Sequence, residues 1–191
     1  MTEPWEHDWT LYGWPFEEFR YDTEWKRLST FLNGIGVTAS TNRMIGEPER
    51  KLTLRSIDQH VHHVNFGTRG ILIDPIGLRL DFDPPCWRLV TYLGSDVFDD
   101  TRFPELRCFA SDGAYIGGDG GPEAASSGLM TTYGPENELP SEEHPRARPF
   151  QYLVCMPSKY PLLNYVPRPI AAATITLAGT ETFCGLIQCT L

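Results

Sequence analysis

Residues 77–82 read Gly-Leu-Arg-Leu-Asp-Phe, and this short stretch decides the fold class. Leu78 and Leu80 alternate with Arg79 and Asp81. An alternation of apolar and charged side chains is typical of an antiparallel strand that has one face in a core and one face in solvent. Gly, Pro and Asp residues bound the stretch on both sides, as turn residues bound strands. The segment therefore predicts a half-buried β-strand.

The same type of pattern recurs along most of the chain. It predicts strands over residues 52–57, 59–65, 70–74, 87–93, 150–156, 170–177 and 183–191. A short loop at residues 178–181 lies between the last two strands, so we expect them to pair as a β-hairpin. Many short strands in a chain of 191 residues favour a single all-β domain. The expected fold is an antiparallel sandwich or a jelly-roll-like barrel with long loops.

One short N-terminal helix is also expected, over Thr23–Leu32. Asp22 is a suitable N-cap, and an apolar stripe runs along the segment from Trp25 to Leu32. Asn33-Gly34 supplies the residues that end helices. The sequence therefore predicts an all-β domain over residues 23–191 with a helix at its start.

Residues 1–22 form an unusual aromatic and acidic N-terminal arm. The first 25 residues hold eight aromatic and seven acidic side chains against one basic side chain, Arg20. Clustered aromatic residues are typical of protein–protein interfaces. We expect a partner-binding role for Trp5, Trp9, Trp14, Phe16 and Phe19. The alternative is that the arm folds back over its own sheet as a lid, and the sequence leaves both open.

The net charge of −9 comes from one segment. Residues 95–143 hold eleven acidic residues and two arginines, and much of this segment falls in a Gly- and Pro-rich stretch that predicts a long acidic loop at about 111–149. No run of basic residues is present that could neutralise phosphates, so direct binding to nucleic acid or to an anionic membrane is not expected. An acidic loop is suited to a basic protein partner.

The sharpest chemical pattern is Asp58-Gln-His60-Val-His62. On a strand these three side chains would share one face and could ligate a divalent metal ion. The string resembles the first metal motif of amidohydrolase-type barrels, which need about 200 residues or more; fewer follow it here. The His60-Val-His62 pair also resembles that of the cupins, but Asn65, Phe66 and Gly67 stand where cupins place a glutamate. The competing interpretation is a solvated polar strand face, and no cofactor is expected.

These observations favour a non-catalytic structural or interaction protein that acts as a subunit of a larger assembly through protein partners or self-association. An accessory component of a viral or phage particle is one plausible setting. The alternatives are a small metal-dependent, cupin-like β-barrel enzyme that uses Asp58, His60 and His62, and a regulatory module that docks a basic protein. The N-terminus lacks a secretory signal, the five cysteines are odd in number, and no glycosylation sequon occurs. We therefore expect an intracellular (cytoplasmic) location or a place within a virus particle, not secretion.

Overall fold

The computed structural model describes ten segments of the chain. They are residues 14–15, 19–32, 34–56, 69–73, 76–95, 105–120, 132–133, 150–155, 167–176 and 182–191. All regular elements in these segments are β-strands, and every strand pairing is antiparallel. The all-β prediction is confirmed for this part of the chain. None of the residues described forms a helix that could cross a membrane.

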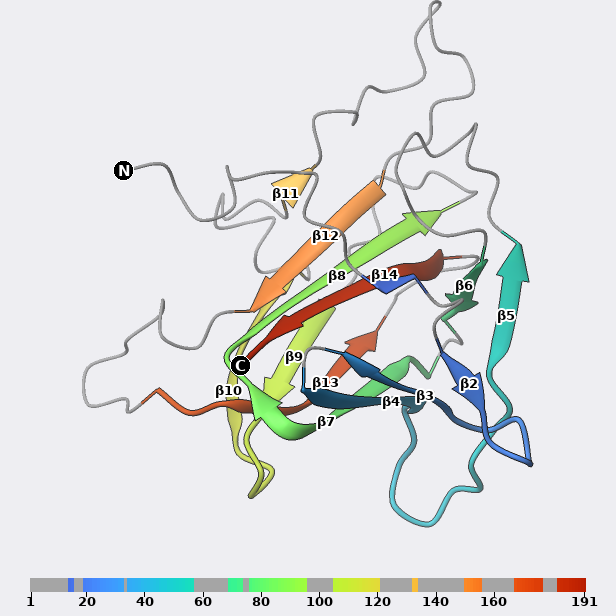
Figure 1. Cartoon of the computed structure of the whole chain (residues 1–191), viewed down its shortest axis with the longest axis horizontal. Coiled ribbons are helices and arrows are strands. Elements are labelled where there is room, and N and C mark those ends of the chain that lie inside the picture. The colour runs from blue at the N-terminus through green and yellow to red at the C-terminus, as the bar shows by residue number, and fades with distance from the viewer. Residues whose placement is uncertain are drawn as a thin grey trace, which may run out of the picture.

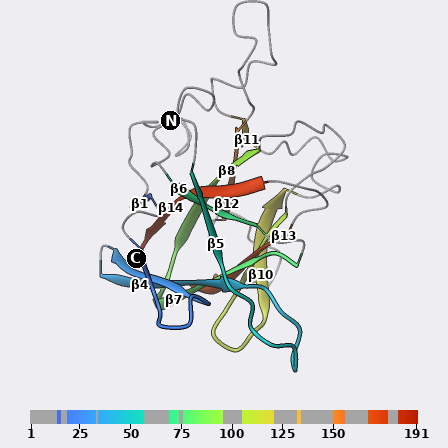
Figure 2. The same ribbon diagram turned by 90° about the vertical axis from the view of Figure 1, so that its right-hand side faces the viewer.

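Each of the two sheets contains seven strands. In the first sheet the order is β11 (Thr132–Tyr133), β12 (Phe150–Cys155), β8 (Arg88–Ser95), β14 (Thr182–Thr190), β6 (Arg69–Leu72) and β5 (Thr53–Ser56), and β1 (Trp14–Pro15) also pairs with β14. In the second sheet the order is β10 (Tyr115–Gly120), β9 (Glu105–Phe109), β13 (Ile170–Thr176), β7 (Leu78–Cys86), β4 (Ile35–Thr41), β3 (Leu28–Leu32) and β2 (Arg20–Tyr21). Figures 1 and 2 show the two layers from directions 90° apart.

The chain passes repeatedly from one sheet to the other. From β6 onward it runs first sheet, second sheet, first sheet for β6, β7 and β8, and then enters the second sheet for β9 and β10. It returns to the first sheet for β11 and β12, enters the second sheet for β13 and ends in the first sheet with β14. Seven of the twelve strand pairings therefore join strands that are not consecutive in the sequence.

A single hydrophobic core lies between the sheets. The alternation at the start of β7 places Leu78, Leu80 and Phe82 in this core, while Arg79 and Asp81 stay partly exposed. The core side chains from both sheets form one cluster. Burial of apolar surface on two facing sheets is what holds such layers together.

The predicted helix over Thr23–Leu32 is wrong. The Asp22 N–H donates to the Arg27 carbonyl at 3.0 Å, so residues 22–27 form a turn, and β3 begins at Leu28. Asp22 does bond to the backbone as a capping residue would, because one of its carboxylate oxygens accepts the Lys26 N–H at 2.9 Å. Trp25 adopts a left-handed φ of 61°, which ends any helical path at that residue. Long-range pairing of β3 with β4 then determines the structure of Leu28–Leu32.

Two further expectations also differ from the structure. The strands over 170–177 and 183–191 exist as β13 and β14, but they lie in different sheets and do not form a hairpin. The expected loop at about 111–149 begins instead with strand β10, which pairs with β9 across a tight turn. In that turn the Ala110 N–H donates to the Ala114 carbonyl at 2.9 Å. Residues 121–131 and 134–149 lie outside the described part of the chain.

Candidate interaction surface

The expected metal-binding residues Asp58, His60 and His62 lie outside the described residues. Within the segments that the structure describes, no group of three or more His, Cys, Asp or Glu side chains is arranged to hold a metal ion. A metal site at Asp58, His60 and His62 stays a prediction.

The structure places two of the five expected partner-binding aromatics. Trp14 lies in β1, where its backbone is opposite Ile187 of β14, and Phe19 is only 4% exposed and belongs to the core. Trp5, Trp9 and Phe16 lie outside the described residues. Residues 14–15 thus belong to the first sheet and residues 20–21 to the second. Phe19 is not part of a contact surface because its side chain is covered.

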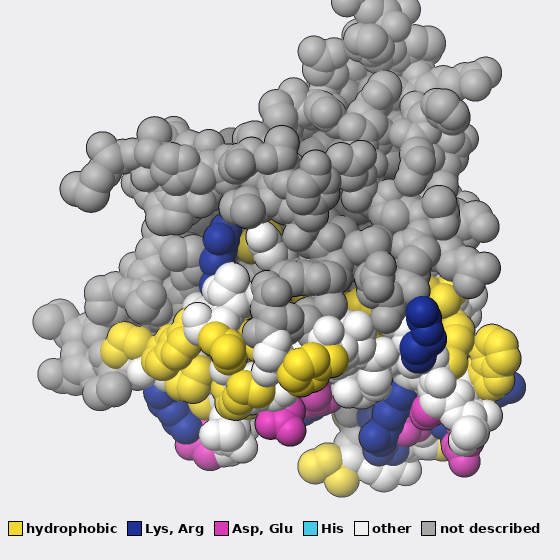
Figure 3. All heavy atoms as spheres, in the orientation of Figure 1, with side chains coloured by type: hydrophobic (Ala, Val, Ile, Leu, Met, Phe, Trp, Pro, Cys, Tyr) yellow, Lys and Arg dark blue, Asp and Glu magenta, His cyan; other side chains and the backbone are white. Residues whose placement is uncertain are grey.

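A cluster of exposed apolar side chains lies at one end of the sheets. Phe31 is 72% exposed, Trp87 42% and Leu191 62%. Pro84, near the end of β7, is exposed as well. We call these four residues the apolar end. In Figure 3 apolar side chains gather on the lower left, over the region where Figure 1 places the C-terminal end and the bend after β7.

Backbone pairing brings the members of the apolar end together from three parts of the sequence. The Trp87 N–H donates to the Thr190 carbonyl at 2.8 Å, which holds the β7–β8 bend beside the end of β14. A Leu191 methyl carbon lies 3.6 Å from where a Cβ would stand on Gly34. Phe31 is opposite Gly36 on β4, and Gly36 is in turn opposite Asp83 on β7. The surface is therefore built by long-range pairing.

The outer face of the second sheet carries charged side chains that neutralise one another. The Arg79 guanidinium donates to both oxygens of Asp81 at 2.7–3.0 Å. The Arg107 guanidinium lies 5.1 Å from the centre of the Tyr115 ring and 3.7 Å from Glu105. Such partly exposed pairs are typical of a solvated sheet face.

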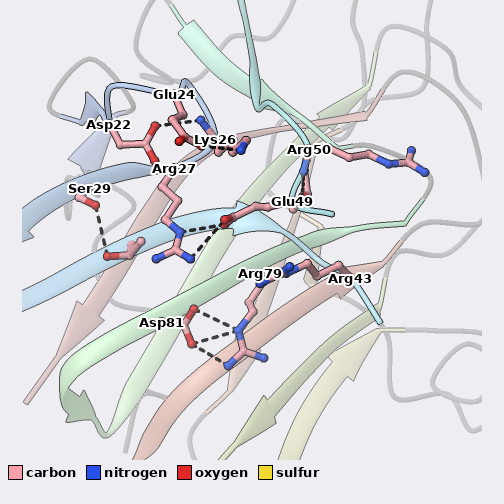
Figure 4. A network of polar contacts seen from close by, with 12 residues as sticks. Asp22, Glu24, Lys26, Arg27, Ser29, Arg43, Glu49, Arg50, Arg79 and Asp81 are labelled. Carbon is pink, nitrogen blue, oxygen red and sulfur yellow. Dashed lines mark hydrogen bonds and ion pairs between the residues drawn. The ribbon is translucent and has the colours of Figure 1, made fainter. Parts of the chain in front are cut away.

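A second set of ion pairs lies in the turn between β2 and β3 and links this turn to the loop between β4 and β5. Arg27 donates to both carboxylate oxygens of Glu49 at 2.8 and 3.2 Å, which lowers the pKa of that carboxyl group (Figure 4). Lys26 pairs with Glu24, and this raises the pKa of the lysine. These contacts hold a loop in place and leave no carboxylate poised for acid–base chemistry among the pairs drawn.

All five cysteines are buried and none is in a disulfide. The neighbouring Cys189 thiol, followed by burial, raises the pKa of Cys86. Burial, followed by a hydrogen bond with the Cys155 thiol, raises the pKa of Cys108 well above its usual range. Thiols with raised pKa are poor nucleophiles at neutral pH. They are not candidates for catalysis in this conformation.

The chain was compared with protein-family models, with curated proteins and with solved structures, and nothing matches in any of the three.

Proposed function

We propose that this chain is a jelly-roll subunit of a larger assembly and acts by contact with a neighbouring subunit rather than by catalysis. The order of its strands supports the fold assignment. The four strands β6-β14-β8-β12 of one sheet and β7-β13-β9-β10 of the other follow the order B-I-D-G and C-H-E-F of an eight-stranded jelly roll. Strands β2, β3 and β4 extend the second sheet beyond this set.

The observation that carries the functional proposal is the apolar end. Phe31, Trp87 and Leu191 expose large apolar side chains at one place, although a single exposed apolar residue would mean little. Aromatic residues contribute most to the energy of protein interfaces when they become buried in the contact. A partner that covers this end would remove their apolar surface from water.

The proposed setting within a viral or phage particle rests on analogy. Jelly rolls occur in viral capsid proteins, but also in lectins and cupins, so the fold alone assigns no function. The absence of a basic run in the sequence favours an outer or accessory position over direct contact with a genome.

The experiment is to measure the mass of the purified full-length protein by light scattering and to examine the sample by electron microscopy. We expect oligomers or particles much heavier than the 21.6 kDa chain. Phe31→Asp should reduce the mass to that of the monomer, because it places a charge in the contact. A wild-type protein that stays monomeric at its highest soluble concentration would refute the proposal.

The chain offers a matched control in Ile45, which is fully exposed in the turn after β4. β4 runs from Ile35, next to the apolar end, to Thr41, so this turn lies at the opposite end of the strand. Ile45→Asp should leave the assembly unchanged. Equal loss of assembly in both variants would show that a general increase in charge, not the apolar end, is responsible.

The metal-dependent enzyme and the regulatory docking module stay as alternative predictions. Stoichiometric metal in the purified protein, lost in His60→Ala, would favour the enzyme. Binding to a basic protein that weakens steeply with salt would favour the docking module.

A further inference from the structure

One pair of cysteines joins the two sheets at the bend between β7 and β8. Cys86 is the last residue of β7 in the second sheet, and Cys189 lies on β14 in the first. Their next residues are hydrogen-bonded, since the Trp87 N–H donates to the Thr190 carbonyl at 2.8 Å. Both cysteines are fully buried, one on each side of this backbone hydrogen bond. The two sulfurs therefore meet across the gap between the sheets.

A second pair joins the sheets further along the core. Cys108 lies on β9 in the second sheet and Cys155 on β12 in the first. Gly117 is opposite Cys108, and a Cβ on Gly117 would lie 3.6 Å from the Cys155 sulfur. The Cys155 side chain thus reaches the second sheet beside Cys108.

The four thiols form two pairs rather than one group of four. Leu89 of β8 is opposite Cys155 on one side and opposite Cys189 on the other, so a leucine strand position separates the two pairs within the first sheet. The described residues include no set of three or more ligands that could hold a metal ion, which sets a four-cysteine zinc site aside. Buried cysteines are common in protein cores. Two facing pairs, each with one member from each sheet, are not explained by that tendency alone.

We infer that Cys86–Cys189 and Cys108–Cys155 are sites of oxidative modification, where a small-molecule disulfide such as oxidised glutathione converts each pair into a cross-link between the sheets. A disulfide brings two sulfurs to about 2 Å, so each cross-link requires the two facing cysteines to approach each other across the core. The inference does not depend on the proposed assembly.

The chemistry is two successive thiol–disulfide exchanges at each pair. One cysteine thiolate attacks the small disulfide, forms a mixed disulfide and releases one small thiolate. The second cysteine of the pair then attacks the protein sulfur of that mixed disulfide and releases the other small thiolate. Two protein thiols are oxidised, one small disulfide is reduced to two thiols, and the two protons lost by the protein are taken up by the leaving thiolates.

Burial controls when this reaction can occur. The four thiols are fully covered, so a small-molecule disulfide cannot reach them in the closed structure. Exchange must proceed while the two sheets are locally open or while the chain folds. Once formed, the cross-links are shielded from reductants in the same way.

The experiment is to unfold and refold the full-length protein in a glutathione redox buffer and to count the thiols that a maleimide alkylates after denaturation. Before oxidation all five cysteines should be alkylated. Afterwards only Cys184 should react, and peptide mapping should show the two expected linkages. The thermal midpoint should rise by roughly 10 °C and return when the protein is reduced. Five alkylated cysteines after refolding, or linkages between other cysteines, would refute the inference.

Two variants separate the pairs. Cys184→Ser should keep both cross-links, because Cys184 belongs to neither. Cys189→Ser should make Cys86 reactive towards maleimide while the Cys108–Cys155 linkage still forms. If the serine variant does not fold, Cys189→Ala provides the same test without a buried hydroxyl. A variant of Cys189 in which Cys108 and Cys155 also remain reduced would contradict the independent pairing.

Discussion

The approach of β7 to β13 depends on a glycine, and replacing it is the sharpest test of the sheet geometry. Gly77 precedes β7 and has a φ of +95°, in a region that L-residues with a side chain rarely adopt. A Cβ at this position would lie 2.6 Å from the Ile175 carbonyl oxygen and 3.1 Å from a methyl carbon of Thr176. Gly77→Ala therefore meets both a backbone penalty and a steric one.

The two penalties can be given separate magnitudes. The left-handed conformation costs an alanine about 1–2 kcal/mol. Forcing extra volume into a packed site costs about 1–3 kcal/mol, and here the obstacle is backbone that cannot rotate away. The expected loss in the free energy of unfolding is about 2–5 kcal/mol, a large share of the 5–15 kcal/mol typical of a domain.

Two other glycines isolate each penalty. Gly113 has a φ of +84°, but nothing lies within 4 Å of its Cβ position, so Gly113→Ala should lose only about 1–2 kcal/mol. Gly118 has no left-handed φ, yet its Cβ would lie 2.1 Å from the Leu106 carbonyl oxygen. Gly118→Ala should therefore lose stability through contact alone.

Urea unfolding at one fixed, low protein concentration measures these differences through the midpoint and the m-value. The reasoning requires Gly77→Ala to be clearly less stable than Gly113→Ala at an unchanged m-value. Equal losses in these two variants would mean that β7 does not approach β13 as closely as described, and the argument would fail.

Three further predictions concern single side chains. Phe19→Ala should cost about 3–5 kcal/mol in urea unfolding because its side chain is in the core, whereas Phe31→Ala at the exposed end should change stability by less than about 0.5 kcal/mol; equal effects would contradict the burial. Among the described residues the fully buried Thr91 hydroxyl lacks a hydrogen-bond partner, so Thr91→Val should stabilise the protein by about 1 kcal/mol; a loss of stability would show that the hydroxyl is bonded. Arg27 lowers the pKa of Glu49 in the folded protein, so this ion pair stabilises the fold at pH values above the unfolded carboxyl pKa of about 4.3. Its contribution of about 0.5 kcal/mol or less is lost as the pH falls through the lower folded pKa. The stability difference between wild type and Glu49→Gln should therefore shrink from pH 7 to pH 3, and a constant difference would contradict this prediction.

Local patterns in the sequence predicted the class of structure but not the pairing. The alternation at residues 78–81 predicted part of β7 correctly, and the apolar runs at the end of the chain predicted β13 and β14. The hairpin prediction for these last two was wrong because the partners of β13 are β7 and β9, which precede it by many residues. Short loops between strands suggest hairpins, and the change of sheet between β13 and β14 defeats that inference.

The same limit applies to the surfaces. Phe31, Trp87 and Leu191 are ordinary apolar residues in the sequence, and only the pairing of strands places them at one end. The cysteines have no motif spacing, so their arrangement in pairs across the core also required the structure. In the helix prediction, by contrast, the local pattern was present and misleading. Asp22 accepts a backbone N–H as an N-cap would, but the pairing of β3 with β4 makes Leu28–Leu32 a strand.

Two of the three shortest strands of these sheets stand at outer edges. β11 closes one side of the first sheet and β2 one side of the second, and each contains only two residues. An edge strand of two residues offers an incoming chain few unpaired backbone N–H and C=O groups. Short edge strands therefore protect a sheet against edge-to-edge aggregation. Growth by adding strands is therefore disfavoured at those two borders.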